Sequence, residues 1–583
     1  MLAQWRVADA DLETRQALAT ATGLSPLLCQ VLINRGITDT AAVQAFLTPS
    51  LHDLHDPYLL HGMESAVQRL VTAIRQGERI AVYGDYDVDG VTATALLVTF
   101  FGELGLKVPY YIPERASEGY GLNANSIRQL ASAQVRLLIT VDCGSTALEE
   151  VALARRLGMD MVITDHHQPP DRLPDACAVL NPHQPACRYP NKHLCGVGVV
   201  FKLLTALRAA LRQAPLLTDR LPNLKRHLDL VTLGTIADVM PLREENRVIV
   251  HYGLQELTQT RKPGLQALRQ VSGSAAKSAG VGEVGFQLAP RLNASGRLGS
   301  ATHSVQLLTA SETHEATRLA QLLDTVNQQR RTLQQAMEEA VHERIAQQYN
   351  GRPPAAIVLG DPSWHLGVVG IVAAKIVEAY HRPTFLLHIN GDTARGSGRS
   401  IPAFNLYLGL QHCAQWLRQF GGHKYAAGLT MDTAQLPFLQ EDFIRFAEDT
   451  LAPEDLQPTL RLDAVIALAE ITPALVADLE RCGPHGAGNP VPLFCAQAVQ
   501  LASPIRLLGQ QGQHARFRVA QEGVMLDVVA FHQAEQVMAL PPGAVIDMAF
   551  TPTLNIWRDQ CTLELHLRAL QPHARSLPPL ESH

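Results

Sequence analysis

The segment that most constrains the fold of this chain is an apolar run that ends in three closely spaced carboxylates. Residues 79–83 read Arg-Ile-Ala-Val-Tyr, and residues 84–90 then read Gly-Asp-Tyr-Asp-Val-Asp-Gly. Asp85, Asp87 and Asp89 stand at alternate positions directly after an expected strand, so their negative charges repel one another. Divalent cations shared between the carboxylates remove that repulsion. The segment therefore predicts metal-dependent chemistry, with phosphate as the expected substrate group.

The sequence that follows alternates short β-like runs with helical patterns. Expected strands cover residues 80–83, 107–112, 137–141 and 161–164, with expected helices between them. Strands joined by helical crossovers form a doubly wound parallel sheet, which binds ligands at the carboxyl ends of its strands. We therefore expect an α/β fold in which acidic residues meet at one edge of a parallel sheet.

Stretches that contain Pro and Gly divide the chain into further expected regions. Residues 1–75 are expected to form an N-terminal helical extension, 76–310 the catalytic domain and 311–350 a long connecting helix. Residues 351–452 are expected to form a smaller α/β domain. Residues 453–575 are rich in short alternating runs, which predict an OB-like β-barrel that binds nucleic acid.

The composition excludes several other classes of protein. The chain is 46% hydrophobic and 18% charged, as in ordinary globular proteins. Its nine cysteines form no Cys-x-x-Cys pair, which argues against a structural zinc site and a disulfide framework. The first residues do not resemble a signal peptide, and the longest apolar stretch is too short for a membrane span. We therefore expect a cytoplasmic enzyme that does not work at a membrane.

Three further clusters follow later apolar runs. Asp142 follows residues 137–141, Asp165-His166-His167 follows 161–164, and Asp238 comes soon after 228–233. Each aspartate alone has a structural alternative as a helix N-cap. Together the clusters predict a centre of carboxylate oxygens and imidazoles, which suits Mn²⁺ or Mg²⁺ better than thiolate-bound zinc. A calcium loop starting at Asp85 is excluded, because its twelfth position is Leu96.

These four clusters resemble the motifs of the DHH phosphoesterase superfamily. Residues 395–400, Arg-Gly-Ser-Gly-Arg-Ser, and 421–428, Gly-Gly-His-Lys-Tyr-Ala-Ala-Gly, resemble its DHHA1 substrate-binding domain. Residues 483–490, Gly-Pro-His-Gly-Ala-Gly-Asn-Pro, resemble the entry to the terminal domain of the bacterial RecJ family. The resemblance spans nearly the whole chain. It implies a 5′→3′ exonuclease specific for single-stranded DNA, acting in DNA recombination and repair, with a DHHA1 domain over 351–452.

The resemblance also implies a role for each residue of the metal centre. Two ions, Mn²⁺ or Mg²⁺, are expected, with Asp142 bridging them. The remaining expected ligands are Asp87 for one ion, and Asp89, His166 and Asp238 for the other. His167 is expected to donate to a substrate phosphate, and Asp165 either orients its neighbours or only forms a turn. Tyr83 stands where other branches of the superfamily have a histidine ligand, so the first ion is expected to bind loosely or to lean on Asp85.

Residues outside the metal centre are expected to bind the phosphates of the strand. Residues 291–297 place two arginines and an amide on a glycine-containing loop, although pairing with acids between domains is an alternative. Trp364 and Tyr425 are expected in the core. Trp557, beside Arg516, Arg518 and Arg558, is expected to stack on bases. The full set of expected substrate contacts is Arg115, Asn293, Arg297, Arg395, Ser397, Arg399, His423 and Trp557.

Two other functions compete with this one. The first is an oligoribonuclease or a small-nucleotide phosphodiesterase or phosphatase of the same superfamily, and the extra C-terminal segment favours a polymer over such substrates. The second is a non-catalytic DNA-binding scaffold, which the presence of every acid argues against. The expected partners are single-stranded DNA, with a single-stranded-DNA-binding protein and a recombination helicase as candidates, and the chain is expected to be a monomer.

Overall fold

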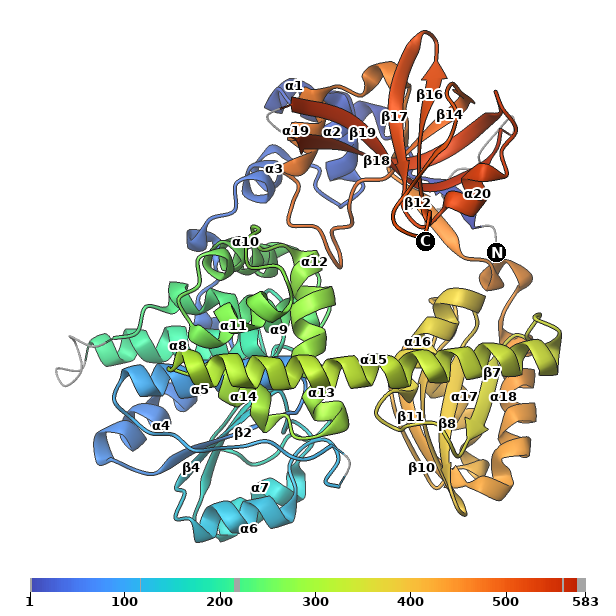
Figure 1. Ribbon diagram of the computed structural model, residues 1–583. Helices are drawn as coiled ribbons and strands as arrows, with labels where there is room; N and C mark the ends of the chain where they lie inside the picture. Colours follow the sequence, from blue (N-terminus) through green and yellow to red (C-terminus); the bar gives the residue numbers. More distant parts are fainter. Residues whose placement is uncertain (1–2, 116, 214–220, 558–559, 574–583) are drawn as a thin grey trace. The chain divides into compact units, whose positions relative to one another are not determined.

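The computed structural model describes residues 3–115, 117–213, 221–557 and 560–573, without the side chains of 556, 557 and 560. These residues form two compact units (Figure 1). The first unit consists mainly of Pro57–Asp238 and Gly253–Pro458, and the second of Gln4–Asp56, Val239–Tyr252 and the chain from Thr459 onward. Among the described residues no single helix is long and apolar enough to cross a membrane, and only the bent pair Leu12–Thr22 and Pro26–Ile33 passes together by length and composition.

The first unit contains a five-stranded parallel sheet in the order β3-β2-β4-β5-β6. Its strands are β2 (Ile80–Gly84), β3 (Tyr110–Tyr111), β4 (Leu137–Val141), β5 (Asp160–Thr164) and β6 (Ala178–Leu180). The central strands are buried on both faces because helices cover both (Figure 1). On one face lie α4 (Met63–Gln76), α5 (Val88–Glu103) and α8 (Gly196–Arg212), and on the other α6 (Ala124–Ser132) and α7 (Leu148–Arg156). The prediction of a doubly wound parallel sheet is confirmed.

The register of this sheet brings the predicted acids to one edge. Gly84 pairs with Val141, Val141 with Thr164, and Thr164 with Leu180. The residues that follow these strand ends are Asp85, Asp142, Asp165 and Asn181. The three carboxylates therefore lie side by side where the strands end, as the sequence predicts, and the amide of Asn181 lies beside them.

Two segments near this edge are helices. The apolar run 228–233 belongs to α9 (Leu228–Ala237), and Asp238 is the C-cap of that helix. The segment 291–297, expected as a loop, lies in α13 (Ala289–Leu298), so that expectation is wrong. Position 296 inside α13 requires glycine, because a Cβ there would lie 2.7 Å from the Tyr86 carbonyl oxygen. A π-helical turn (Val284–Leu288) precedes α13, where Pro290 cannot donate to the regular helical pattern.

A second sheet of the first unit has the strand order β10-β11-β9-β8-β7. Its strands are β7 (Ile357–Asp361), β8 (Thr384–Asn390), β9 (Thr393–Arg399), β10 (Gln419–Gly422) and β11 (Ala426–Asp432), with α16 (Val369–Tyr380), α17 (Leu406–His412) and α18 (Leu436–Thr450) against them. The helix α15 (Thr313–Tyr349) runs between the two sheets of this unit (Figure 1). It packs on α11 (Pro263–Val271) and α13 at one end and on α16 at the other.

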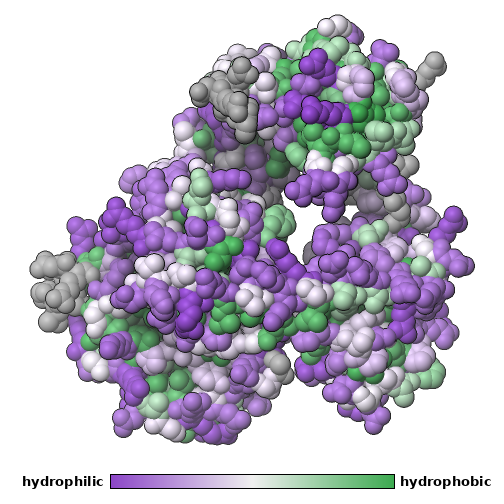
Figure 2. All heavy atoms as spheres, in the orientation of Figure 1, coloured by the Kyte–Doolittle hydropathy of each residue, from purple (hydrophilic) through white to green (hydrophobic). Residues whose placement is uncertain are grey.

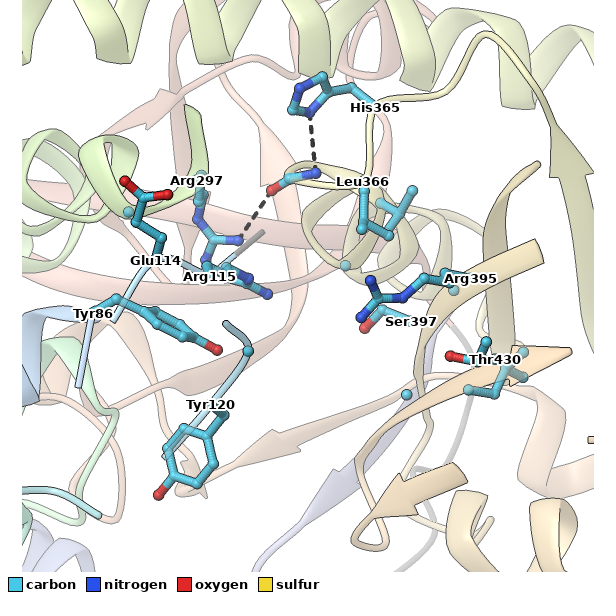
Figure 3. Close-up of a pocket in the computed structure, with 18 of the residues that line it drawn as sticks. Tyr86, Glu114, Arg115, Tyr120, Arg297, His365, Leu366, Arg395, Ser397 and Thr430 are labelled. Atoms are coloured by element: carbon cyan, nitrogen blue, oxygen red, sulfur yellow. Dashed lines mark hydrogen bonds between the residues drawn. The ribbon is translucent and has the colours of Figure 1, made fainter. Parts of the chain in front are cut away.

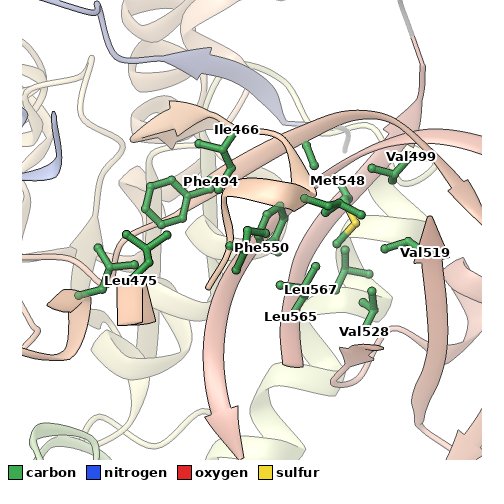
Figure 4. Close-up of a cluster of buried hydrophobic side chains, with 14 of the residues drawn as sticks. Ile466, Leu475, Phe494, Val499, Val519, Val528, Met548, Phe550, Leu565 and Leu567 are labelled. Carbon is green, nitrogen blue, oxygen red and sulfur yellow. The ribbon is translucent and has the colours of Figure 1, made fainter. Parts of the chain in front are cut away.

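The second unit is built on a closed barrel. Its sheet runs β13-β14-β18-β19-β17-β16-β15, where β13 is Ala464–Val465 and β15 is Arg506–Leu508, and an additional pairing of β14 with β16 closes it. The barrel strands are β14 (Phe494–Leu501), β16 (His514–Gln521), β17 (Val524–Ala530), β18 (Val545–Trp557) and β19 (Gln560–Pro572). Phe494, Met548, Phe550 and Leu565 fill its interior (Figure 4). This barrel confirms the predicted OB-like domain.

The N-terminal segment belongs to the same unit as the barrel. The strand β1 (Gln4–Val7) pairs in parallel with β12 (Thr459–Leu462). Helices α1 (Leu12–Thr22), α2 (Pro26–Ile33) and α3 (Thr40–Leu47) contribute apolar side chains to the core around the barrel. Residues 4–56 therefore share a unit with the chain from Thr459 onward, whereas the sequence suggested one N-terminal extension over 1–75 that also held α4.

Candidate metal centre and phosphate-binding cleft

The acidic turn after β2 places its aspartates at the start of α5. Asp87 caps this helix, because its Oδ1 accepts hydrogen bonds from Asp89 N at 2.9 Å and Gly90 N at 3.2 Å. A Cβ on Gly90 would lie 2.6 Å from the Asp85 carbonyl oxygen, so the turn requires glycine there. One oxygen of Asp87 therefore has a structural role in this turn, and its other oxygen remains available to bind a cation.

Asp89 binds the start of a second helix. Its two oxygens accept from Gly196 N at 2.5 Å and Val197 N at 2.8 Å, at the N-terminus of α8. Asp89 is almost fully buried there. The positive end of the helix dipole stabilises a carboxylate in this position.

His166 faces three of the carboxylates. Its Nε2 lies 3.0 Å from Asp142 Oδ1 and 3.6 Å from both Asp89 Oδ2 and Asp238 Oδ2. Burial, reinforced by the charge of His167, lowers the pKa of His166 to about 3. The ring is therefore neutral near pH 7 and offers a lone pair, as a metal ligand must.

Candidate ligand atoms lie within 4.8 Å of one another in three groups. Asp142 and His166 each belong to two of them, so these two residues connect the groups. The groups are Asp85–Asp87–Asp142, Asp89–His166–Asp238 and Asp142–His166–His167. This arrangement brings together every metal ligand expected from the sequence, with Asp85 beside Asp87 as expected, and it also includes His167.

The electrostatics of these carboxyls fit bound cations. Among the described residues, Asp85 Oδ1, Asp142 Oδ1 and Asp238 Oδ2 are buried without a hydrogen-bond partner. Burial, followed by the charges of neighbouring aspartates, raises the pKa of Asp85 and Asp142 well above the usual range. The same causes raise the pKa of Asp89 to about 6 and that of Asp238 to about 8. Hard divalent cations compensate both the burial of these carboxylates and the repulsion between them, and they prefer oxygen ligands of this kind.

Asp165 lies beside the centre and binds its neighbours. Its Oδ1 accepts from His166 N at 2.8 Å, His167 N at 3.1 Å and His167 Nδ1 at 2.8 Å, and its Oδ2 accepts from Ser145 N at 2.9 Å. Burial opposes the charged form of Asp165, yet the bond and charge of His167 lower its pKa to about 2. Burial also opposes a charged His167, but Asp165 raises the pKa of that ring to about 9. The pair is therefore a buried carboxylate and a half-exposed imidazolium.

Tyr83 does not reach the metal centre. Its hydroxyl donates to the Gly121 carbonyl oxygen at 3.0 Å, and burial raises the pKa of its hydroxyl. The position of the missing histidine ligand is therefore not filled by the phenol oxygen, and Asp85 is the residue that joins Asp87 and Asp142.

A cleft of about 770 Å³ lies next to this centre in the first unit. Figure 3 shows Arg115 and Arg297 on one wall and Arg395 and Ser397 on the other. Tyr120 also lines the cleft, and its hydroxyl lies 3.0 Å from both the Asp142 carbonyl oxygen and His167 Nδ1. The cleft and the metal centre thus share a wall.

The arginines of the cleft lack acidic partners in the part of the chain that the structure describes. Burial, then the charges of Arg115 and Arg399, lower the pKa of Arg297 to about 10, and burial with Arg115 lowers that of Arg399. Among the described residues Arg297 has no ion pair, and it donates only to the Gly367 carbonyl oxygen, at 3.3 Å. Arg291 differs, because its Nε lies 2.8 Å from Asp324 Oδ1. The ion-pair alternative therefore applies to Arg291. Arg115, Arg297 and Arg395, which line the cleft, and Arg399 make no ion pair among the described residues, so their guanidinium groups remain available to an anion.

The other residues expected to contact the substrate have different surroundings from one another. Asn293 accepts from Val88 N at 3.1 Å and so supports the start of α5. Burial and the charge of Arg399 lower the pKa of His423, which places it near the same arginines. Arg399 donates to Ser397 Oγ at 3.0 Å. Trp364 is buried as expected, whereas Tyr425 is half-exposed, so the expectation of a core position for it is wrong.

The stacking platform expected in the barrel has a different environment. The side chain of Trp557, and all of Arg558, lie outside the described residues. Arg516 pairs with Asp527 and Glu564, and Arg518 pairs with Asp527, so neither charge is free for phosphate. Sequence reasoning also missed Tyr120, whose only local signal is its position between Gly119 and Gly121.

Comparison with known proteins identifies the same parts. Residues 79–235 match the DHH family, N-terminal domain, residues 353–449 the DHHA1 domain, and residues 462–569 the RecJ OB domain. The chain is 37% identical to the single-stranded-DNA-specific exonuclease RecJ of Bacillus subtilis, over 97% of this chain and 70% of that protein. It is 34% identical to the RecJ of Escherichia coli, over 94% and 96% respectively.

Solved structures agree with this assignment. The crystal structure of RecJ in complex with Mn²⁺ from Thermus thermophilus has a TM-score of 0.83 and 32% identity, covering 98% of this chain and 80% of that one. The Mg²⁺ complex from the same organism has a TM-score of 0.77 and 31% identity, covering 98% and 79%. Both ions expected from the sequence thus occur in these similar proteins.

Without divalent metal, the stability of this protein is expected to fall as the pH rises from 7 to 9. A carboxyl with a raised pKa stabilises the folded state while it is protonated, and that contribution is lost as the pH rises through about 8 for Asp238. The contribution of His167, whose pKa is about 9, is lost in the same direction. Thermal melts in EDTA and in saturating Mn²⁺ test this, since bound cations remove the need for protons.

The control for this prediction is Asp238→Asn, which removes one titrating group. Its melting temperature in EDTA is expected to fall less between pH 7 and 9 than that of the wild type. Equal pH slopes for the two proteins in EDTA, or equal wild-type slopes with and without Mn²⁺, contradict the assignment.

Proposed function

This chain belongs to the RecJ family of single-stranded-DNA-specific exonucleases, and we propose that it degrades single-stranded DNA 5′→3′ by metal-dependent hydrolysis in recombination and repair. The observation that carries this proposal is the shared wall between the carboxylate centre and a cleft of arginines without acidic partners among the described residues. Tyr120 lines that cleft and donates to the Asp142 carbonyl oxygen. A phosphate bound by the arginines is therefore held next to the proposed metal ligands.

The proposed chemistry needs two divalent ions, Mn²⁺ or Mg²⁺. When bound, such ions supply a water that loses its proton near neutral pH, and they polarise the phosphodiester. Asp142 is proposed as the shared ligand, because it groups with Asp85 and Asp87 and its Oδ1 also lies 3.0 Å from His166 Nε2 on the other side. The other proposed ligands are Asp85 and Asp87 on one side, and Asp89, His166 and Asp238 on the other.

His167 and Asp165 are proposed to act on the substrate as a pair. Asp165 accepts the Nδ1 proton of His167 and keeps the ring charged near pH 7, since its pKa is about 9. The Nε2–H of this imidazolium remains to donate to a phosphate oxygen. Charge that develops on the phosphate during hydrolysis is thereby stabilised by a donor already in place.

Asp142→Ala is expected to abolish release of nucleotides from a 5′-labelled single-stranded oligonucleotide in Mn²⁺. Losing a ligand shared by both ions should cost several orders of magnitude in rate. The control is Asp175→Ala, which removes an exposed carboxylate that pairs with Arg155. Turnover of Asp142→Ala within about tenfold of wild type, a barrier change of only ~1.4 kcal/mol, contradicts the assignment. A 3′-labelled strand, with and without EDTA, tests the direction and the metal requirement.

Arg297→Ala and Arg399→Ala are each expected to weaken binding of single-stranded DNA about tenfold or more, since a charge-assisted bond contributes about 1.5–3 kcal/mol. Each is also expected to flatten the slope of log affinity against log salt by about 0.7 of a unit. Melting temperatures should change little, because neither arginine has an ion pair among the described residues.

Arg291→Ala is the matched control for these two variants, because Arg291 lies in the same helix as Arg297 but pairs with Asp324. It is expected to lower the melting temperature and to leave the salt slope unchanged. If Arg297→Ala and Arg399→Ala behave like Arg291→Ala, their proposed role in phosphate binding is wrong.

The barrel is proposed to hold longer strands through aromatic side chains. Figure 2 shows apolar side chains exposed on this unit, and Phe531 is 49% exposed. Its ring centroid lies 5.5 Å from that of His514 and 5.2 Å from that of His566. Such a cluster of exposed rings suits stacking on unpaired bases, which contributes about 1–3 kcal/mol per base.

Phe531→Ala is therefore expected to weaken binding of a long single strand about fivefold or more, with little change in the rate on a dinucleotide. Phe438→Ala is the control, since Phe438 is 51% exposed but stacks on Trp416 in the first unit. Fluorescence anisotropy with strands of increasing length checks the prediction. Unchanged affinity of Phe531→Ala for every length refutes this platform.

The proposed setting follows from the substrate. We propose that the protein acts in the cytoplasm as a monomer, with a single-stranded-DNA-binding protein and a recombination helicase as partners. Membership of this family supports single-stranded DNA as the substrate, and both proposed partner proteins also bind single-stranded DNA.

A further inference from the structure

Tyr83 stands beside the acidic turn, yet its side chain reaches a loop that carries substrate-binding groups. It is fully buried at the end of β2. Its hydroxyl donates to the Gly121 carbonyl oxygen at 3.0 Å and accepts from Asn123 Nδ2 at 3.3 Å. Its ring stacks on Tyr111 with centroids 5.2 Å apart and planes inclined by 27°. Tyr83 therefore binds both ends of the segment between β3 and α6.

Glu118 is the second anchor of that segment. Its Oε1 accepts from Tyr111 Oη at 2.6 Å and from Asn123 Nδ2 at 2.9 Å. Its Oε2 accepts from Glu114 N at 2.8 Å, and its own N–H donates to the Glu114 carbonyl oxygen at 2.8 Å. One carboxylate thus joins the last residue of β3, the start of the loop and the N-cap of α6.

The loop held in this way contributes two groups to the cleft. Arg115 lies with its guanidinium carbon 5.2 Å from the centroid of the Tyr86 ring, and its charge lowers the pKa of Arg297 and Arg399 after burial. Tyr120 bonds to the Asp142 carbonyl oxygen and contacts His167. Neither residue lies in a helix or a strand, so neither is placed by a regular hydrogen-bond pattern.

The backbone around Tyr120 makes this anchoring necessary. Gly119 and Gly121 have φ of +83° and +87°, in the left-handed region that glycine adopts without strain. Glycines on both sides of Tyr120 leave the free chain many conformations, and selecting one costs conformational entropy. The bonds of Tyr83 and Glu118 lie on either side of this turn and oppose that cost.

We propose that Tyr83 and Glu118 are positioning residues that hold the loop and so place Arg115 and Tyr120 for the phosphates of the strand; this rests on the exonuclease function proposed above. Tyr83 occupies the place of a ligand histidine in other branches of the superfamily, but here its hydroxyl bonds the loop that carries Arg115 and Tyr120. Loss of that hydroxyl should therefore change substrate binding and leave metal binding intact.

The experiment compares Tyr83→Phe and Glu118→Gln with Tyr110→Phe. Tyr110 precedes Tyr111 on β3, and among the described residues its hydroxyl makes no hydrogen bond to the loop. KM and kcat are measured on a 5′-phosphorylated single strand, Mn²⁺ affinity by titration calorimetry without DNA, and loop mobility by hydrogen exchange. Arg115→Ala and Arg115→Ala/Glu118→Gln complete a double-mutant cycle.

Tyr83→Phe and Glu118→Gln are expected to raise KM by about three- to tenfold, as the loss of one or two hydrogen bonds allows, with kcat nearly unchanged. The loop should exchange faster, the Mn²⁺ affinity should match that of the wild type, and Tyr110→Phe should match it throughout. In the Arg115→Ala background, Glu118→Gln should raise KM by a smaller factor than in the wild-type background, because part of its effect passes through Arg115.

Three results overturn the proposal. One is weaker Mn²⁺ binding by Tyr83→Phe, which makes the tyrosine part of the metal site. The others are full multiplication of the Arg115 and Glu118 effects, and faster loop exchange with unchanged KM. A wild-type protein that leaves the strand intact refutes the exonuclease function, and it is distinguished from a failure of this proposal because exchange and Mn²⁺ titration require no DNA.

Discussion

Buried carboxylates of like charge, brought together by the register of one parallel sheet, are the constraint on which the rest of this site depends. Charges placed this close in the interior destabilise the fold unless each has a partner. Asp165 has four N–H donors, Asp89 has the first turn of α8, and Asp87 caps α5. Asp85 and Asp142 each keep a buried oxygen without such a donor among the described residues. The fold thus satisfies most of its buried acids and leaves unsatisfied those at the point where cations are needed.

The parts of the fold that follow from local patterns could be predicted from the sequence. Runs such as 137–141 are short, apolar and followed by an acid, and a parallel strand buried on both faces has this pattern. The run 228–233 has a similar apolar composition but forms a helix. A short apolar run alone does not distinguish a buried strand from a buried helix. The pairing of β1 with β12 joins residues far apart in the chain, and no local signal near Trp5 indicates its partner Leu460.

The same limit applies within the site. Arg291 and Arg297 lie in one helix and look equivalent in the sequence, but only tertiary packing brings Asp324 to the first and leaves the second without an ion pair among the described residues. The sequence pointed to the candidate metal ligands, which the fold brings together, because their residue types carry the chemistry. Its only local signal for Tyr120, the two flanking glycines, does not show a function, because this tyrosine acquires its role only when the loop is anchored beside Asp142. Positioning groups are therefore harder to predict than ligands.

The phosphate cleft repeats the logic of the metal centre with the opposite sign. Its walls come from two sheets of the first unit, linked by the 37 residues of α15, a helix about 55 Å long at 1.5 Å per residue. The walls meet where Arg297 donates to Gly367, and a Cβ on that glycine would lie 2.5 Å from the Arg297 carbonyl oxygen. Because Arg297 stands both at this contact and among the cations of the cleft, a phosphate bound there as proposed would neutralise the cations and so also stabilise the contact between the walls. In both places the fold gathers like charges, so a counter-charge from outside the chain, a cation in one place and a phosphate in the other, would relieve their repulsion.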